Sequence, residues 1–270
     1  MREPIKTPGQ TVQQKPPNTV TTASLPNSES LSDWHRNGYA IVPDVLTAET
    51  VDRLLMLVET ARRREDRAEA VANRSGVYAL RNLTDVIPEI LLLLQLPSVQ
   101  RILQNILSAP AFLVRSTLFD KTVGANWGVF WHQDLSIAVC ERYEVPGFRA
   151  WTKKAGVVSV QPPAELMSRI VAVRLHLDDC TINNGALRVL PGTHISGRLD
   201  AGEVETAASA KTEVICEVPA GGAVLMNPLT LHSSLPMTTA EHRRVIHLEF
   251  ADFDLTAPLQ WKYRIPVTQE

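Results

Sequence analysis

Val129-Phe130-Trp131-His132-Gln133-Asp134 joins a short apolar strand to two potential metal ligands. Side chains at positions i and i+2 of a β-strand project from the same face, so His132 and Asp134 can reach one metal ion while Gln133 points away. A histidine from a distant strand would complete a set of two imidazoles and one carboxylate, which leaves the remaining coordination positions open. This stretch therefore predicts a metal site on a β-rich scaffold.

The second half of the sequence contains a series of short apolar runs that predict β-strands. The runs are separated by Gly, Pro, Asn and Asp turns and fall at residues 112–115, 129–132, 170–177, 186–190, 223–226 and 245–250. This rhythm favours an eight-stranded jelly roll, in which residues about 100 positions apart meet inside the barrel. Asp134 and His232 are 232 − 134 = 98 positions apart. The expected fold class is mainly β, a double-stranded β-helix (jelly roll, cupin-like) with flanking N-terminal α-helices.

The N-terminal part of the sequence predicts a tail followed by helices. Residues 1–28 are rich in Pro, Thr, Gln and Ser and contain almost no large apolar groups, so they cannot bury enough surface to offset the entropy of ordering. We expect a loosely ordered tail there and a single domain over residues 29–270. Thr47 is placed to cap a helix that starts near Ala48, and a second helical region, interrupted by prolines, is expected over residues 85–107.

Residues 141–165 lack a clear period and contain two glycines and three prolines. We expect them to form a loop over the mouth of the barrel, because the stretch is long for a plain connection.

The composition favours a small-molecule partner in a reducing compartment. The net charge of −2 and the pI near 6.4 give no electrostatic reason to expect binding to nucleic acid or to an anionic membrane. The three cysteines are widely spaced, which argues against a disulfide framework or a structural zinc site. The longest apolar run is far shorter than the roughly 20 residues that a membrane span needs. We therefore expect a cytoplasmic protein.

Several motifs, taken in order, resemble the phytanoyl-CoA dioxygenase (PhyH) family of iron(II)- and 2-oxoglutarate-dependent oxygenases. They are Asp33-Trp34-His35-Arg36-Asn37-Gly38-Tyr39 leading into Val42-Pro43-Asp44-Val45-Leu46, then Trp131-His132-Gln133-Asp134, then Leu177-Asp178-Asp179, then Asn184-Gly185-Ala186-Leu187-Arg188-Val189-Leu190-Pro191-Gly192-Thr193-His194, and finally His232-Ser233-Ser234 with Arg243. The resemblance covers roughly residues 31–255. The His-Gln-Asp motif is weak alone, but the ordered set is specific.

The resemblance implies a site and its cofactors. It places the iron ligands at His132, Asp134 and His232, and the arginine that holds the distal carboxylate of 2-oxoglutarate at Arg243. Ser234 is the implied hydroxyl partner of that carboxylate. The implied cofactors are iron(II), 2-oxoglutarate and O₂. The chemistry agrees, because a planar guanidinium can hold a carboxylate through two hydrogen bonds.

Other residues are candidates for the same pocket. Arg115, 17 positions before His132, is a softer candidate for the other end of the cosubstrate. Arg174 and His176 share one face of a predicted strand; if that face lines the barrel, Arg174 could hold an anionic group of the substrate.

Three further histidines compete with His232 for the last ligand position: His176, His194 and His247. His247 and Glu249 share the face of Arg243, and either a pocket-lining or an outer role fits them. We interpret His35 and His242 as surface residues.

The expected function is a dioxygenase that hydroxylates an unactivated C–H bond of a small molecule and releases succinate and CO₂. The carboxylate at Asp134 favours hydroxylation, since halogenating relatives of this fold lack it. Two alternatives remain open at this stage: a cupin-like zinc or manganese hydrolase or isomerase, and a non-catalytic binding module on the same barrel. Arg243 separates the first alternative from the oxygenase, because a hydrolase has no use for a guanidinium directed at a cosubstrate.

Overall fold

The computed structural model describes residues 34–63, 70–73, 76–154, 156–239 and 242–267. The predicted tail, residues 1–28, lies outside these ranges. Within them, no helix is both long enough and apolar enough to cross a membrane.

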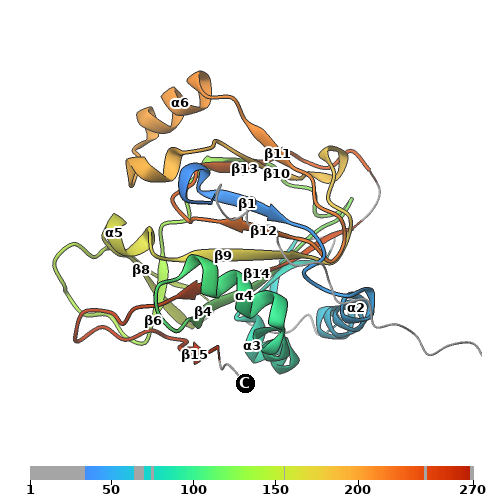
Figure 1. The fold of residues 1–270 in the computed structure, drawn as a ribbon, viewed down its shortest axis with the longest axis horizontal. Coiled ribbons are helices and arrows are strands. Elements are labelled where there is room, and N and C mark those ends of the chain that lie inside the picture. The colour runs from blue at the N-terminus through green and yellow to red at the C-terminus, as the bar shows by residue number, and fades with distance from the viewer. Residues whose placement is uncertain (1–33, 64–69, 74–75, 155, 240–241, 268–270) are drawn as a thin grey trace, which may run out of the picture.

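In the described part of the chain, the largest sheet contains eight antiparallel strands (Figure 1). Its order is β1 (Tyr39–Val42), β12 (Ala223–Met226), β9 (Val171–His176), β14 (Arg243–Ala251), β4 (Phe112–Lys121), β3 (Gly76–Arg81) and β2 (Ala70–Asn73), with β15 (Ile265–Pro266) paired to β4. The centre of this sheet is formed by strands that the apolar runs of the sequence predict. The run at residues 112–115 is the start of a longer strand than expected.

A smaller sheet packs against the large one and closes the barrel (Figure 1). Its order is β11 (Val214–Cys216), β10 (Leu187–Val189), β13 (His232–Ser234) and β5 (Val129–His132). The two sheets share an apolar cluster that includes Ala172, Val224 and Met226 from the large sheet and Leu187, Val189 and Cys216 from the small one. Two facing antiparallel sheets with flanking helices are the predicted jelly-roll architecture.

The expected loop over residues 141–165 is wrong in its second half. Two strands, β7 (Arg149–Lys154) and β8 (Val157–Gln161), form a third sheet with β6 (Ile137–Val139). Five of the six residues of β7 are exposed, so this strand has no apolar alternation to reveal it. A short helix, α5 (Ala164–Met167), follows β8.

The N-terminal helices form where the sequence predicts them. Helix α2 (Ala48–Arg62) begins after Thr47, whose hydroxyl accepts a hydrogen bond from the backbone N–H of Thr50 at 3.2 Å. The second helical region is divided before each proline into α3 (Leu83–Val86), η1 (Pro88–Gln95) and α4 (Pro97–Ile106). Further helices include η2 (Ile182–Asn184), η3 (Thr193–Ser196) and α6 (Ala201–Ala210).

These N-terminal helices cover the outer face of the large sheet. One core cluster contains Leu54 and Val58 of α2, Ile90 of η1, Ile102 of α4, Val173 and Leu175 of β9, and Ile246, Leu248 and Phe250 of β14. Because side chains alternate along a strand, the residues between these apolar positions point into the barrel. On β9 and β14 those inward residues include Arg174, His176, Arg243, His247 and Glu249. The fold therefore gives the large sheet an apolar outer face and an inner face that is polar on β4, β9 and β14, beside the apolar cluster shared with the small sheet.

Candidate functional site

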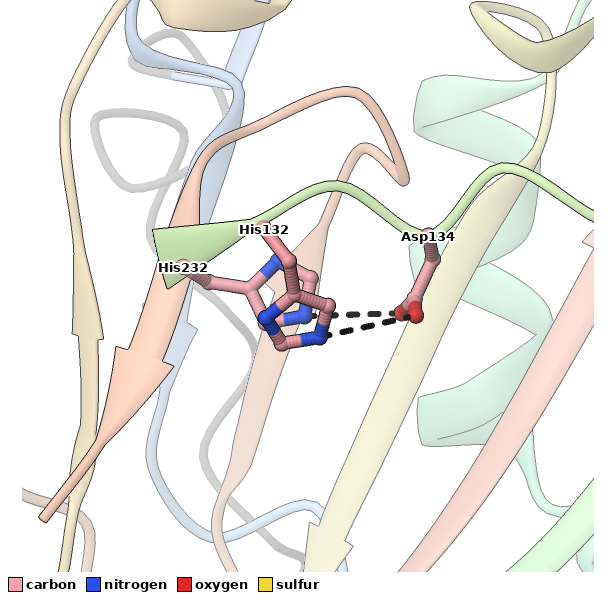
Figure 2. A group of neighbouring side chains, drawn as sticks. All are labelled: His132, Asp134 and His232. Atoms are coloured by element: carbon pink, nitrogen blue, oxygen red, sulfur yellow. Dashed lines mark ion pairs between the residues drawn. The ribbon is translucent and has the colours of Figure 1, made fainter. Parts of the chain in front are cut away.

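His132, Asp134 and His232 lie together on the inner side of the small sheet (Figure 2). His132 ends β5 and His232 begins β13, and the two residues are direct partners in the antiparallel ladder. Their ring centroids are 4.1 Å apart. Asp134 faces both rings, with Oδ1 3.9 Å from Nε2 of His132 and Oδ2 3.6 Å from Nε2 of His232. The potential ligand atoms all lie within 4.8 Å of one another.

Backbone carbonyls orient both imidazoles. Nδ1 of His132 is 2.8 Å from the carbonyl oxygen of Phe130, and Nδ1 of His232 is 2.9 Å from that of Thr230. A carbonyl oxygen only accepts hydrogen bonds, so each Nδ1 carries the hydrogen and each Nε2 keeps its lone pair on the side of Asp134. Metal-binding histidines are commonly held in this way.

Gln133 points away from these three residues, as strand alternation predicts. Its Nε2 donates to the carbonyls of Gly197 at 2.8 Å and Leu229 at 2.7 Å, and its Oε1 accepts from the N–H of Leu199 at 2.9 Å. The amide therefore joins the backbone between the two potential ligands to two neighbouring loops.

The ionisation of the trio suits metal binding near neutral pH. Burial lowers the pKa of His232 to about 4 against the opposing attraction of Asp134. Burial by itself would raise the pKa of Asp134, but the neighbouring histidines, His232 foremost, lower it to about 2. At neutral pH this arrangement presents a neutral imidazole and a carboxylate.

The other histidines lie elsewhere. Among the described residues, the only cluster of three or more potential His, Cys, Asp or Glu ligands is the trio above, so neither His176 nor His247 completes it. His176 is buried on the inner face of β9. His35 and His242 are exposed, as expected, and His242 pairs with Asp120 at 2.9 Å.

A cavity of about 230 Å³ lies between the trio and the inner face of the large sheet. Three rows of paired residues form the facing wall: Arg243 opposite Lys121; His247 opposite Thr117 and Arg174; and Glu249 opposite Arg115. The polar set of β9 therefore faces the barrel, and Arg174 lines the cavity.

His247 is held between two charged groups of this wall. Its Nδ1 is 3.0 Å from Nη1 of Arg174, and its Nε2 is 3.2 Å from Oε1 of Glu249. Of the two roles left open by the sequence, His247 and Glu249 take the pocket-lining one.

Arg243 and Ser234 both line this cavity and are both buried. Nη1 of Arg243 donates to the carbonyl of Gly185. Arg115 lies at the opposite end of the β4–β14 ladder, where Nη2 donates to the carbonyl of Ser136 at 2.7 Å. It also lines a second cavity, so its contact with the cosubstrate stays a prediction.

Sequence reasoning missed one charged residue of the cavity, Lys121. It is fully buried at the end of β4 and lies opposite Arg243. The available signal was the alternation of β4, since residues 115, 117, 119 and 121 share one face with the candidate Arg115.

The sequence model of the phytanoyl-CoA dioxygenase family matches residues 34–245. The chain belongs to this family. It is an enzyme of the iron(II)- and 2-oxoglutarate-dependent dioxygenases, as the motifs predict. The family match agrees with the jelly-roll fold.

Known relatives of this phytanoyl-CoA dioxygenase family protein share its fold along most of the chain. The L-proline trans-4-hydroxylase of Streptomyces griseoviridis is 26% identical over 259 residues, which cover 85% of this chain and 88% of the relative. The structure of the α-ketoglutarate-dependent carbocyclase SnoK from nogalamycin biosynthesis has a TM-score of 0.65 at 18% identity and covers 84% of this chain and 85% of its own. EctD from S. alaskensis with 2-oxoglutarate and 5-hydroxyectoine has a TM-score of 0.62 at 19% identity, covering 83% and 76%.

The residues present fit an iron(II) ion. Two imidazole nitrogens and one carboxylate, with a cavity beside them, form the donor set typical of non-haem iron(II) oxygenases, which keep open coordination positions. Both imidazoles already have the tautomer that a metal needs.

Proposed function

We propose that this protein hydroxylates an unactivated C–H bond of a small organic acid, with His132, Asp134 and His232 as the iron ligands. The observation that carries the proposal is the position of this trio, which faces a cavity whose opposite wall holds Arg243. In this proposal the metal and the distal carboxylate of the cosubstrate bind on opposite walls of one cavity. A hydrolase would need only the first of them.

Each residue has a distinct task in this proposal. The trio would hold the metal through two imidazole nitrogens and one carboxylate. Arg243 and Ser234 bind the distal carboxylate and orient the cosubstrate. Bound iron(II) supplies the oxidative decarboxylation of 2-oxoglutarate, in which one atom of O₂ enters succinate and the other the hydroxyl group of the product. The barrel walls exclude water from this reaction.

A second cavity, of about 370 Å³, supports an acidic substrate. It shares Arg115, Thr117, Phe119 and Trp127 with the first cavity, so the two are neighbours across one wall. The described residues that line it include three cations, Arg81, Arg115 and Lys154, and no Asp or Glu. Arg115 already pairs with Glu249 at 3.5 Å, so a carboxylate bound in this cavity would be favoured mainly by Arg81 and Lys154. The relative from S. griseoviridis is a hydroxylase of L-proline, which is also a small molecule with a carboxylate.

Binding of the cosubstrate under anaerobic conditions tests the proposal. Addition of iron(II) and 2-oxoglutarate to the wild-type protein should produce the weak visible absorption band of the keto acid chelate. In air, the protein should consume 2-oxoglutarate and form succinate, and a screen of small organic acids that shift the band should identify a product with one added oxygen atom.

Substitutions of the ligands complete the test. His132→Ala, Asp134→Ala and His232→Ala should each strongly weaken the absorption band and abolish coupled turnover, because the metal loses one of its three protein ligands. His35→Ala is the matched control, since it removes an exposed histidine far from these donors in sequence and should leave both properties unchanged. Wild-type succinate formation in the Asp134 or His232 variant would contradict the proposal.

A further inference from the structure

Lys121 is a buried cation at the end of the cavity where Arg243 lies. The side chain has no solvent-accessible surface. Its Nζ donates to the hydroxyl oxygen of Ser234 at 2.9 Å and to the carbonyl oxygen of Leu235 at 2.7 Å. Nζ also lies 5.5 Å from the centroid of the Trp127 ring. An ammonium group has three hydrogens, so one remains without an oxygen acceptor after the two hydrogen bonds. Lys121, Ser234 and Arg243 all line the same cavity.

No carboxylate forms an ion pair with either cation at this end, Lys121 or Arg243, among the described residues; Asp120 attracts Arg243 electrostatically, but its carboxylate pairs with Arg62 at 3.0 Å and with His242 at 2.9 Å. The polar contacts of Lys121 and Arg243 include the hydroxyl of Ser234 and the carbonyls of Leu235 and Gly185. The carboxylate on the same wall, Glu249, is six residues along β14 from Arg243, which is roughly 20 Å along a strand. A buried charge is costly unless an opposite charge accompanies it, so this end of the cavity is suited to an anion.

Ser234 can donate a hydrogen bond to the same anion. Its oxygen accepts a hydrogen from Lys121, so its own hydroxyl hydrogen is free to be donated elsewhere. The remaining hydrogen of the ammonium, the hydroxyl hydrogen of Ser234 and the guanidinium of Arg243 are three donors without a carboxylate. A carboxylate has two oxygens that can accept all three.

We infer that Lys121 is a second cationic anchor for the distal carboxylate of 2-oxoglutarate, acting with Arg243 and Ser234. The inference rests on the proposed function and adds a residue to its cosubstrate site. Lys121 also connects β4 to the chain after β13, so the experiment must separate binding of the carboxylate from support of the fold.

Two keto acids distinguish a role of Lys121 in binding the carboxylate from a role in supporting the fold. 2-Oxoglutarate and 2-oxopentanoate have the same five-carbon chain and the same keto acid end, but 2-oxopentanoate has a methyl group in place of the distal carboxylate. Lys121→Met keeps the length of the side chain and removes its charge. In anaerobic titrations of the iron(II)-loaded full chain, this variant should bind 2-oxoglutarate at least tenfold more weakly than the wild type and bind 2-oxopentanoate equally well.

The pH dependence of the wild type gives a test without a variant. Burial, with a smaller contribution from Arg243, lowers the pKa of Lys121 to about 7. A carboxylate beside the ammonium would raise that pKa, so binding of 2-oxoglutarate takes up a proton at a pH above 7. Its affinity relative to 2-oxopentanoate should be greatest below pH 7 and fall by up to about tenfold per pH unit above it.

The groups around Lys121 do not reproduce this pattern. Arg243 on β14 and Arg174 on β9 stay charged in this range, since the pKa of Arg174 is about 10. Burial raises the pKa of the Cys180 thiol and lowers that of His176, so both stay neutral. The remaining ionisable groups of the wall have partners other than Lys121: His247 contacts Arg174 and Glu249, and His232 on β13 faces Asp134.

Lys121→Arg provides the control for charge, because a guanidinium stays protonated and should remove the decrease above pH 7. An equal loss of affinity for both keto acids in Lys121→Met would show a structural role and overturn the inference, as would unchanged binding of 2-oxoglutarate. If the wild type binds neither keto acid, the proposed function fails and the inference fails with it.

Discussion

At the scale of single residues, Gln133 shows how a position between two potential ligands contributes without contacting a metal. Its amide makes three hydrogen bonds to the backbone of Gly197, Leu199 and Leu229. Gln133→Ala should destabilise the fold by roughly 3 kcal/mol, at about 1 kcal/mol for each bond. It should also weaken iron(II) binding about tenfold, because the backbone that orients the predicted ligands loses its support.

Chemical denaturation and metal titration measure these two effects. Gln104→Ala is the matched control, since Gln104 is exposed on α4 and its removal should change stability by less than about 0.5 kcal/mol. Equal stability of the two variants would contradict the role given to Gln133.

Some residues of the site can be predicted from their neighbours in the sequence, and others only from contacts with distant strands. His132 and Asp134 are two positions apart on one strand, so local alternation is enough to predict that they share a face. Lys121 is different, because its importance comes from Arg243, 122 positions later in the chain, and from Ser234. The sequence around Lys121 shows only a polar end of an apolar strand. Pairing between distant strands, which local patterns do not contain, decides its role.

At the scale of elements, the turn between β9 and β10 requires a glycine where it packs against Leu235 and Lys121. Gly185 has a φ of +78°, and a Cβ there would lie 2.6 Å from the carbonyl oxygen of Leu235 and 3.1 Å from Nζ of Lys121. Gly185→Ala should therefore cost about 1 kcal/mol of backbone strain and a further 1–3 kcal/mol for the displaced neighbours. The affinity for 2-oxoglutarate should decrease as Lys121 moves.

Gly156, before β8, offers a matched control for this change. Its φ is +74°, but a Cβ there would meet nothing within 4 Å. Gly156→Ala should show only the strain, about 1 kcal/mol, and unchanged binding of 2-oxoglutarate. Denaturation curves and keto acid titrations compare the two variants; equal losses of stability would contradict the close packing around Gly185.

Helices and strands could be predicted where burial of one face requires apolar residues at regular spacing. Helix α2 has both a capping threonine and apolar residues at helical spacing, and the strand at β12 is a continuous apolar run; both form with the predicted starts. Strand β7 lies in a small third sheet and is mostly exposed, so burial imposes no pattern on its sequence. Its pairing with β8 is set by backbone hydrogen bonds, which every residue type except proline can form in full.

At the scale of the whole molecule, the two faces of the large sheet lie in different environments. Its outer face packs against α2, η1 and α4 in one apolar cluster, and its inner face carries the charged residues of the cavity. Displacing the helices would expose the back of the strands that hold Arg243 and Arg174. We therefore propose that the helices and the barrel form a single cooperative unit, in agreement with the single domain expected for residues 29–270.

Substitutions on α2 test this cooperativity. Leu54 is 4% exposed and belongs to the shared core, so Leu54→Ala should destabilise the protein by about 2–5 kcal/mol and lower Tm by on the order of 10 °C. Met56 is 66% exposed on the same helix, and Met56→Ala should change Tm little. Calorimetry should show one transition in each variant, with the whole transition shifted in Leu54→Ala. Because the proposed site for iron(II) and 2-oxoglutarate lies on the other side of the sheet, these ligands should raise Tm of both variants by similar amounts. A transition that divides into two parts, only one of them shifted, would mean that the helices unfold separately from the barrel.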